Sequence, residues 1–262
     1  MEKVAYEEFT AELVGTLGER PEVLGLVAVG SMASGPDAWS DHDVLVIAEP
    51  GATEGLRADP TWLPHHERLV LHFRETAHGM KAVYDDGHLV EFAVFAPDEI
   101  SQALLNRTRV LLDRADVKAR VAATVAGTPD RIPEAAHSDA YLEGQLLTAL
   151  LVGVQRHRRG EHLSGLDFVH RFALRHFLVL LARHVETDRP EVKDDLNPFR
   201  RVELAHPDVG AELRRIFATG DLEETARGLL ELAAWTFSHV FDTGRPAWDV
   251  VRRYLEAPQP RK

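Results

Sequence analysis

Cysteine is absent from the sequence of 262 residues, and its absence excludes disulfide bonds, thiolate metal sites and cysteine nucleophiles. Long apolar runs are also missing, because every hydrophobic stretch is interrupted well before the roughly 18 residues that a membrane-spanning helix requires. The start of the chain does not show the charged and then apolar layout of a secretory signal. We therefore expect a soluble, cytoplasmic protein without a membrane partner.

Positive charge is scarce as well. The formal net charge is −12 with neutral histidines, whereas a protein that binds nucleic-acid backbone needs a basic face that releases counterions. We therefore expect no nucleic-acid partner and favour a cationic small molecule. With 45% hydrophobic residues, the chain can bury one large core or two modest ones.

An Asp-His-Asp triplet opens one of the predicted apolar strands. Asp41 and Asp43 flank His42 at the start of a strand over residues 41–48. Side chains of a strand alternate between its faces, so the two carboxylates share one face and His42 points to the other. Neighbouring carboxylates repel each other, and Mg²⁺ relieves this repulsion because it prefers carboxylate and phosphate oxygens. The triplet therefore indicates a magnesium site.

A Gly-Ser turn follows the preceding apolar strand, which is predicted over residues 24–29. Gly30 lets the backbone approach a phosphate closely. Ser31 can donate hydrogen bonds from its hydroxyl and its backbone N–H. The two strands would therefore hold a phosphate-sized turn beside two carboxylates.

A third acid lies in a predicted hairpin. Residues 80–84 and 88–95 flank Asp85-Asp86-Gly87, where the Asp-Gly pair suits a tight turn. Glu91 is the only acid in the otherwise apolar second arm. Burying a lone carboxylate is unfavourable unless a metal ion or a cation compensates for it. The alternative is an acid on the exposed side of an edge strand.

Together these residues resemble a known family. Gly-Ser, nine residues and then Asp-x-Asp leading into an apolar strand is similar to the nucleotidyltransferase superfamily of DNA polymerase beta. Within it, the pattern is most similar to the small bacterial nucleotidyltransferases that modify aminoglycosides and lincosamides. The resemblance implies that Gly30 and Ser31 hold the phosphates of ATP. It also implies that Asp41, Asp43 and Glu91 hold one Mg²⁺ that activates the attacking hydroxyl, and that the two aspartates hold a second Mg²⁺ on the triphosphate.

The predicted fold is α/β (α+β). We expect an N-terminal nucleotidyltransferase domain with a small mixed sheet over residues 1–130, and a C-terminal helical bundle that binds substrate over residues 131–262. The boundary is predicted in the Gly- and Pro-containing stretch 127–133. Residues 51–66 are expected to form a loop. The expected strands span residues 24–29, 41–48, 69–73, 80–84, 88–95 and 109–113, and the expected helices span residues 3–17, 97–106, 117–125, 141–154, 164–184, 209–217 and 222–241.

The helical domain supplies further candidates. The resemblance implies an acidic general base in this domain, and Glu143 is our choice, with Asp139 one turn earlier as the alternative. Arg171 and Arg175 are candidates for clamping the triphosphate, because guanidinium groups bind phosphate in bidentate fashion. Simpler roles remain open: a structural pair for Glu143 within the bundle, and an Asp167–Arg171 ion pair within one helix.

The sequence therefore predicts an enzyme that moves AMP from Mg-ATP to a hydroxyl of a small molecule and releases pyrophosphate. We expect the acceptor to be a cationic antibiotic of the aminoglycoside or lincosamide class. Four acids motivate this choice, namely Asp85, Asp86, Glu134 and Asp139. The alternatives are an antitoxin-like transferase that adds AMP to a protein, a nucleotide-binding protein without turnover, and a helical ribonuclease that would use Arg171 and His176. The sequence leaves the acceptor hydroxyl, the base and the oligomeric state open.

Overall fold

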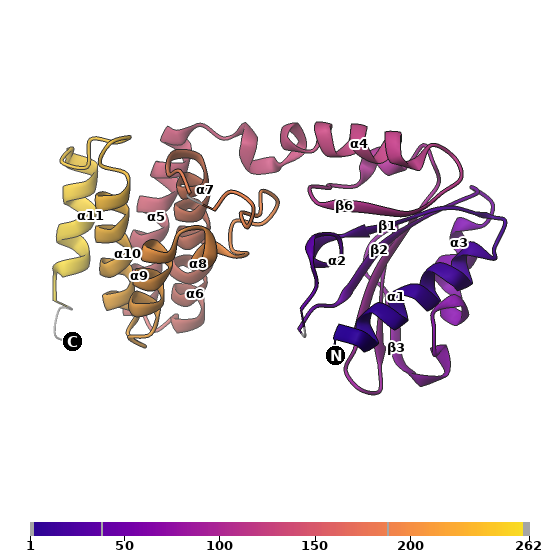
Figure 1. The fold of residues 1–262 in the computed structure, drawn as a ribbon. Helices are drawn as coiled ribbons and strands as arrows, with labels where there is room; N and C mark the ends of the chain where they lie inside the picture. The colour runs from indigo at the N-terminus through magenta and orange to yellow at the C-terminus, as the bar shows by residue number, and fades with distance from the viewer. Residues whose placement is uncertain (1–2, 38, 188, 259–262) are drawn as a thin grey trace. The chain divides into compact units, whose positions relative to one another are not determined.

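The structure is a computed structural model that describes residues 3–37, 39–187 and 189–258. Contacts between residues divide the chain into two compact units, residues 1–132 and residues 133–262. The first unit contains a sheet with helices on its faces, and the second unit is helical (Figure 1). The predicted α/β class, with a mixed sheet followed by a helical region, is thereby confirmed.

A mixed six-stranded sheet forms the first unit, in the order β3-β4-β5-β2-β1-β6. β2 and β5 run parallel, and the other neighbouring strands run antiparallel. The strands are β1 Val23–Val29, β2 His42–Ala48, β3 Leu69–Arg74, β4 Gly79–Tyr84, β5 Leu89–Phe95 and β6 Thr108–Asp113. Each begins and ends within one residue of a predicted strand, because runs of Val, Leu, Ile and Phe bounded by turn residues are a strong local signal.

Helices cover both faces of the sheet. α1 (Lys3–Gly18) packs on one face, and α4 (Val117–Gly127) packs on part of the other. Side chains of β2 alternate between the two cores: Val44 and Val46 lie in the core with α1, whereas Leu45 lies in the core with α4. The odd-numbered positions of β2 therefore belong to the face that carries α4.

One predicted loop contains a helix. Residues 51–66 include α3 (Thr53–Ala58) and the 3-10 turn Pro60–Trp62, and a second 3-10 turn begins at His66. The side chain of Arg57 in α3 is buried, and its Nε donates to the carbonyl oxygen of Val94 at 3.2 Å. This contact joins residues that are far apart in the sequence. Because α3 is held by such a contact, no local pattern predicts it.

The helix predicted over residues 97–106 is wrong. Only the 3-10 turn Ile100–Gln102 forms there. The backbone N–H of Leu105 donates to Oγ1 of Thr128 at 3.0 Å, a long-range bond that a regular helix over this segment would not make. Tertiary contacts therefore override the helical pattern.

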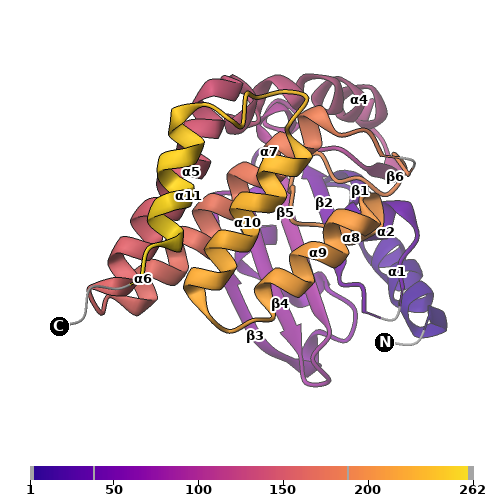
Figure 2. The ribbon, with the colours of Figure 1, turned by 90° about the vertical axis from the view of Figure 1, so that its left-hand side faces the viewer.

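The second unit is built of helices around an apolar core. Figure 2 shows α10 running beside α9 and α11. Among the described residues, none of the helices combines the length and the apolar character needed to cross a membrane. The elements are α5 Asp139–Arg158, α6 His162–Leu166, a π-helical segment Asp167–Ala173, α7 Leu174–His184, α8 Val202–Ala205, α9 Pro207–Phe217, α10 Leu222–Thr236 and α11 Pro246–Glu256.

Several helix ends in this unit differ from prediction; among them, α5 ends at Arg158 rather than at residue 154, and α9 begins at Pro207 rather than at residue 209. α5 begins at Asp139 because the side chain of Ser138 accepts the N–H of Tyr141 at 3.2 Å and caps the helix. The predicted helix over residues 164–184 begins earlier, at His162, and passes through the π-helical segment. The predicted helix over residues 222–241 ends at Thr236, and α11 was not predicted.

Candidate functional site

The turn after β1 brings Gly30 against Asp43. α2 (Gly30–Ser34) begins directly after β1, and Gly30 has a φ of +58°, in the left-handed region that favours glycine. A Cβ atom at Gly30 would lie 3.2 Å from Oδ2 of Asp43. The missing side chain of Gly30 therefore leaves room at the carboxylate, and two predicted site residues from separate segments are neighbours in space.

Asp43 begins a row of charged residues across three strands. Its register partner on β5 is Glu91, and the register partner of Glu91 on β4 is Lys81. Nζ of Lys81 lies 2.9 Å from Oε1 of Glu91 and 2.9 Å from Oε1 of Glu75. Hydrogen bonds to Glu91 and then Glu75 raise the pKa of Lys81 above its usual value. In this structure, Lys81 on the neighbouring strand thus compensates the negative charge of Glu91.

Lys81 is a site residue that was not predicted, although the hairpin carries a signal for it. The hairpin turn was predicted, and its antiparallel register pairs Val83 with Leu89. Counting two more positions away from the turn on each arm places Lys81 opposite Glu91. A lysine facing a lone acid across a hairpin is a favourable cross-strand pair.

Asp41 is held by its backbone. It lies one residue before β2, and the hydroxyl of Tyr6 in α1 donates to its carbonyl oxygen at 2.8 Å. Burial, followed by the carboxylates of Asp41 and Asp43, raises the pKa of Tyr6, whereas the positive charge of Arg109 lowers it. The Tyr6 hydroxyl is therefore a neutral donor that fixes Asp41 from the α1 side.

Arg109 adds a cation to this end of the sheet. It belongs to β6, and its Nη2 donates to the carbonyl oxygen of Met32 in α2 at 3.2 Å. Its side chain is exposed, and its charge acts on the Tyr6 hydroxyl together with the two aspartates. An exposed guanidinium in this position is suited to an anionic ligand. No sequence motif marks Arg109, because its place beside α2 depends on the pairing of β1 with β6.

His42 points to the opposite face, as alternation predicts. Its ring is fully buried, stacks on Tyr6 with 3.7 Å between ring centroids, and has Nδ1 2.8 Å from Nε2 of His88. Burial and then the neighbouring His88 lower the pKa of His42 to about 3. Burial likewise lowers the pKa of His88 to about 4. Both rings are therefore neutral at neutral pH.

This pair makes the stability of the fold depend on pH. In the unfolded chain each histidine titrates near 6.5, so below that pH the unfolded state binds protons that the folded state excludes. Their contribution to stability is complete above pH 6.5 and is lost as the pH falls towards the lowered pKa values. Lowering the pH from 6 to 5 should reduce the free energy of unfolding by about 1 kcal/mol for each of the two rings.

Urea denaturation at pH 6 and pH 5 measures this loss. His88→Phe removes one of the two rings and should remove the part of the pH dependence that this ring contributes, about 1 kcal/mol between pH 6 and pH 5. His66→Gln is the control, since the His66 side chain is exposed. If the wild type and His88→Phe show equal pH dependence of stability, the buried pair of His42 and His88 is not its source.

The donor chemistry at the Gly30 turn fits Mg²⁺. Asp41 and Asp43 offer oxygen ligands only, and Mg²⁺ at phosphate-transfer sites typically takes one or two carboxylates, with phosphates and waters as its other ligands. Among the residues that the structure describes, no three His, Cys, Asp or Glu side chains form a group that could hold one ion. Asp41, Asp43 and Glu91 therefore do not form such a group among the described residues, and their role as metal ligands stays a prediction.

A cavity of about 460 Å³ shares Asp41 with this site. Asp86 also lines it, and Trp39, whose side chain is 94% exposed, forms part of its wall. Carboxylates and an indole ring both attract cations. The cavity is therefore suited to a positively charged ligand.

Glu143 is buried within the helical unit. Its side chain is 2% exposed, and its two oxygens accept from Arg245 and from Nε1 of Trp248, the latter at 2.8 Å. This is the structural pairing that the sequence left open. Asp139 is more exposed and pairs with Arg183 and His184. The side chain of Glu134 lies outside the described residues.

The two residues of the predicted phosphate clamp lie on consecutive elements, Arg171 in the π-helical segment and Arg175 in α7. Arg171 forms an ion pair with Asp167, with Nε 2.6 Å from Oδ1 and Nη2 2.9 Å from Oδ2. That pair is the alternative the sequence left open, and the clamp by Arg171 and Arg175 stays a prediction. Nδ1 of His176 lies 2.7 Å from the carbonyl oxygen of Phe172, so this ring nitrogen is engaged within its own helix.

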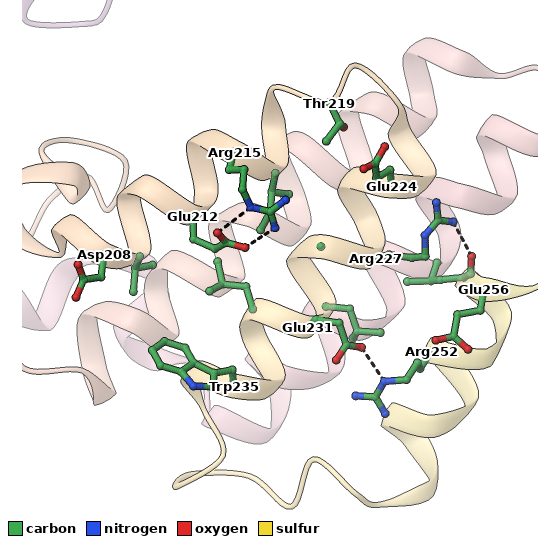
Figure 3. Close-up of a pocket in the computed structure, with 16 residues that line it drawn as sticks. Asp208, Glu212, Arg215, Thr219, Glu224, Arg227, Glu231, Trp235, Arg252 and Glu256 are labelled. Atoms are coloured by element: carbon green, nitrogen blue, oxygen red, sulfur yellow. Dashed lines mark hydrogen bonds and ion pairs between the residues drawn. The ribbon is translucent and has the colours of Figure 1, made fainter.

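A second cavity, of about 740 Å³, lies between α9, α10 and α11 (Figure 3). Arg215 pairs with Glu212 along α9, and Arg252 of α11 pairs with Glu231 of α10. None of the predicted site residues is among the residues that line it. The helical unit thus contains a groove that no sequence motif predicts.

No protein-family model matches the chain, and no curated protein does. Two solved structures are similar to it along most of its length. One is an aminoglycoside 6-adenyltransferase from Bacillus subtilis, with 11% sequence identity and a TM-score of 0.38, covering 95% of this chain and 97% of that chain. The other is a nucleotidyltransferase-like protein from Exiguobacterium sibiricum 255-15, with 14% identity and a TM-score of 0.37, covering 96% of this chain and 88% of that chain.

Proposed function

We propose that the α/β unit transfers AMP from ATP to a hydroxyl of a small molecule and that the reaction depends on Mg²⁺. The observation that carries the proposal is the meeting of Gly30 and Asp43, a turn without a side chain beside a carboxylate whose register partner is Glu91. Phosphoryl-transfer chemistry depends on such an arrangement, because it proceeds mainly through positioning and charge neutralisation.

Each residue has a role that its position permits. Ser31 would donate hydrogen bonds to a phosphate beside the Gly30 turn, and Arg109 would contact the triphosphate from β6. Asp41 and Asp43 would hold Mg²⁺, which when bound neutralises phosphate charge and lowers the pKa of the acceptor hydroxyl. The hydroxyl oxygen forms a bond to the α-phosphorus as the bond to pyrophosphate breaks, and its proton passes to a base or to water.

Glu143 is left out of this mechanism. Both of its oxygens accept hydrogen bonds inside the helical unit, and a carboxylate so engaged would have to give up a partner before it could accept a proton. A contact of Arg171 or Arg175 with the triphosphate remains a separate proposal that the site in the sheet does not require.

The proposed acceptor is a cation, and the aminoglycoside and lincosamide classes fit this chemistry. The cavity that shares Asp41 with the site is lined by a second acid, Asp86, and by the exposed indole of Trp39. An ammonium group in this cavity would be attracted by Asp41 and by the indole face, whereas Asp86 already pairs with Arg68 at 3.1 Å.

Pyrophosphate release with Mg-ATP is the test of this function. A panel of amine-bearing antibiotics is offered as acceptors, and each is weighed by mass spectrometry. We expect pyrophosphate release that depends on one of them, together with the mass gain of one AMP on that compound. Mass gain on a protein instead would favour the antitoxin-like alternative, and no pyrophosphate release with any acceptor would contradict the proposal.

Gly30→Ala tests the contact at the turn. The new methyl group would lie 3.2 Å from Oδ2 of Asp43. The backbone of the alanine would also have to adopt a φ of +58°. We expect about a tenfold lower rate of transfer, and a stability loss of about 1 kcal/mol from backbone strain. Gly220→Ala is the matched control: Gly220 has a φ of +72° with open space around it, so strain is expected there without loss of rate. Equal rates in the two variants would argue against a phosphate site at Gly30.

A further inference from the structure

Lys81 occupies a position that a purely acidic metal site would not need. It lies at the end of the row that Asp43 and Glu91 form across the sheet, and its ammonium bonds an oxygen of Glu91. The side chains of Lys81 and Glu91 are 26% and 32% exposed, so a ligand in solution can reach both. Any divalent ion that shares this oxygen of Glu91 meets the positive charge of Lys81 at close range.

A second carboxylate gives Lys81 an alternative partner. Glu75 follows β3, and its Oε1 lies 2.9 Å from Nζ of Lys81, the same distance as Oε1 of Glu91. If Lys81 releases Glu91, its ammonium therefore keeps one carboxylate contact. The pair with Glu91 is for this reason easier to break than a lone ion pair would be.

We propose that Lys81 is a displaceable counter-ion that controls access of a divalent ion to Glu91, an inference that rests on the proposed function. In the ligand-free protein Lys81 reduces the negative charge beside Asp43, so a divalent ion binds weakly on its own. A bound triphosphate attracts the ammonium of Lys81 away from Glu91. Glu91 then becomes available as a ligand. Lys81 thereby makes metal binding and nucleotide binding depend on each other.

A purely structural role for Lys81 predicts something different. If its ion pairs only join β4 to β5, removing the ammonium would change stability and leave both affinities as they are. The proposed role requires the two affinities to move in opposite directions, which strand pairing alone cannot produce.

The experiment measures binding rather than turnover, with Mn²⁺ alone and metal-free ATP as probes, on the full chain. In Lys81→Met, we expect Mn²⁺ alone to bind about tenfold more tightly, because one positive charge has left the site. We expect metal-free ATP to bind about tenfold more weakly, because the phosphates lose a cation. Lys81→Arg keeps the charge and should restore both values to near the wild type.

Two further variants complete the design. Lys118→Met removes an exposed lysine of α4 in the same unit and should change neither affinity. Glu75→Gln leaves Lys81 with Glu91 as its remaining carboxylate partner in the row and should weaken binding of Mn²⁺ alone severalfold. This variant decides the question by itself if Lys81→Met does not fold.

The outcomes separate the inference from the function. If the wild type binds Mn²⁺ and ATP together but Lys81→Met binds Mn²⁺ no more tightly than the wild type, the counter-ion role is overturned and the proposed function stands. Unchanged Mn²⁺ affinity in Glu75→Gln would also overturn it. If the wild type binds neither Mn²⁺ nor ATP, singly or together, the proposed function itself fails.

Discussion

Asp43→Asn is expected to lower the rate of nucleotidyl transfer by about 10³-fold while the protein keeps its fold. Asp43 is the residue that joins the two halves of the site, because its carboxylate adjoins Gly30 and its register partner is Glu91. An amide of the same shape keeps the packing but removes the charge that would hold a divalent ion. Losing one preorganised electrostatic contact of this kind typically lowers a rate by about 10² to 10³, and losing metal binding adds to that effect.

The measurement is pyrophosphate release at saturating Mg-ATP and acceptor, with thermal denaturation to check folding. Asp98→Asn is the matched control, because Asp98 is an exposed acid of the same unit outside the site. It should keep the wild-type rate. A folded Asp43→Asn variant that turns over within about threefold of the wild type would remove Asp43 from the mechanism.

Glu143→Ala is expected to destabilise the helical unit by about 3 kcal/mol. The substitution leaves Nε1 of Trp248, a fully buried side chain, without its carboxylate acceptor, and an unsatisfied buried donor costs about 1 to 3 kcal/mol. It also removes the ion pair with Arg245. Arg245 is 45% exposed, so water solvates the remaining guanidinium and limits that part of the loss.

Urea denaturation measures this effect, and a second pair on the surface provides the control. Glu231 of α10 forms an ion pair with Arg252 of α11. Like the pair of Glu143 with Arg245, it joins a glutamate to an arginine, but the Glu231 side chain is 57% exposed. Glu231→Ala should therefore cost less than about 1 kcal/mol. Glu143→Gln with wild-type stability and a rate lowered by 10² or more would instead support the general base that the sequence predicted.

The sheet was predictable because its signals are local. Each strand is a short apolar run bounded by turn residues, and each was placed within one residue of its observed ends. The shared face of Asp43 and Glu91 follows from alternation along β2 and β5 together with their parallel pairing. Sequence periodicity supplied the first of these facts, and only the structure supplied the second.

Other features depend on contacts that no short window of sequence contains. The bond of Arg109 to α2 requires the pairing of β6 with β1. Glu143 meets Arg245, a residue 102 positions away, on the segment before an unpredicted helix. A lone acid near the start of a helix was therefore interpreted as a catalytic base, although the fold surrounds it with structural partners.

The central claim is that the Gly30 turn and Asp43 form the site where a divalent ion and a triphosphate meet. A crystal structure with Mn²⁺ and a non-hydrolysable ATP analogue tests it most directly, because anomalous scattering locates the ion. We predict a Mn²⁺ peak bonded to the carboxylate of Asp43, with phosphate oxygens of the analogue beside Gly30 and Ser31. A well-ordered analogue bound elsewhere, with no ion at Asp43, would contradict the account.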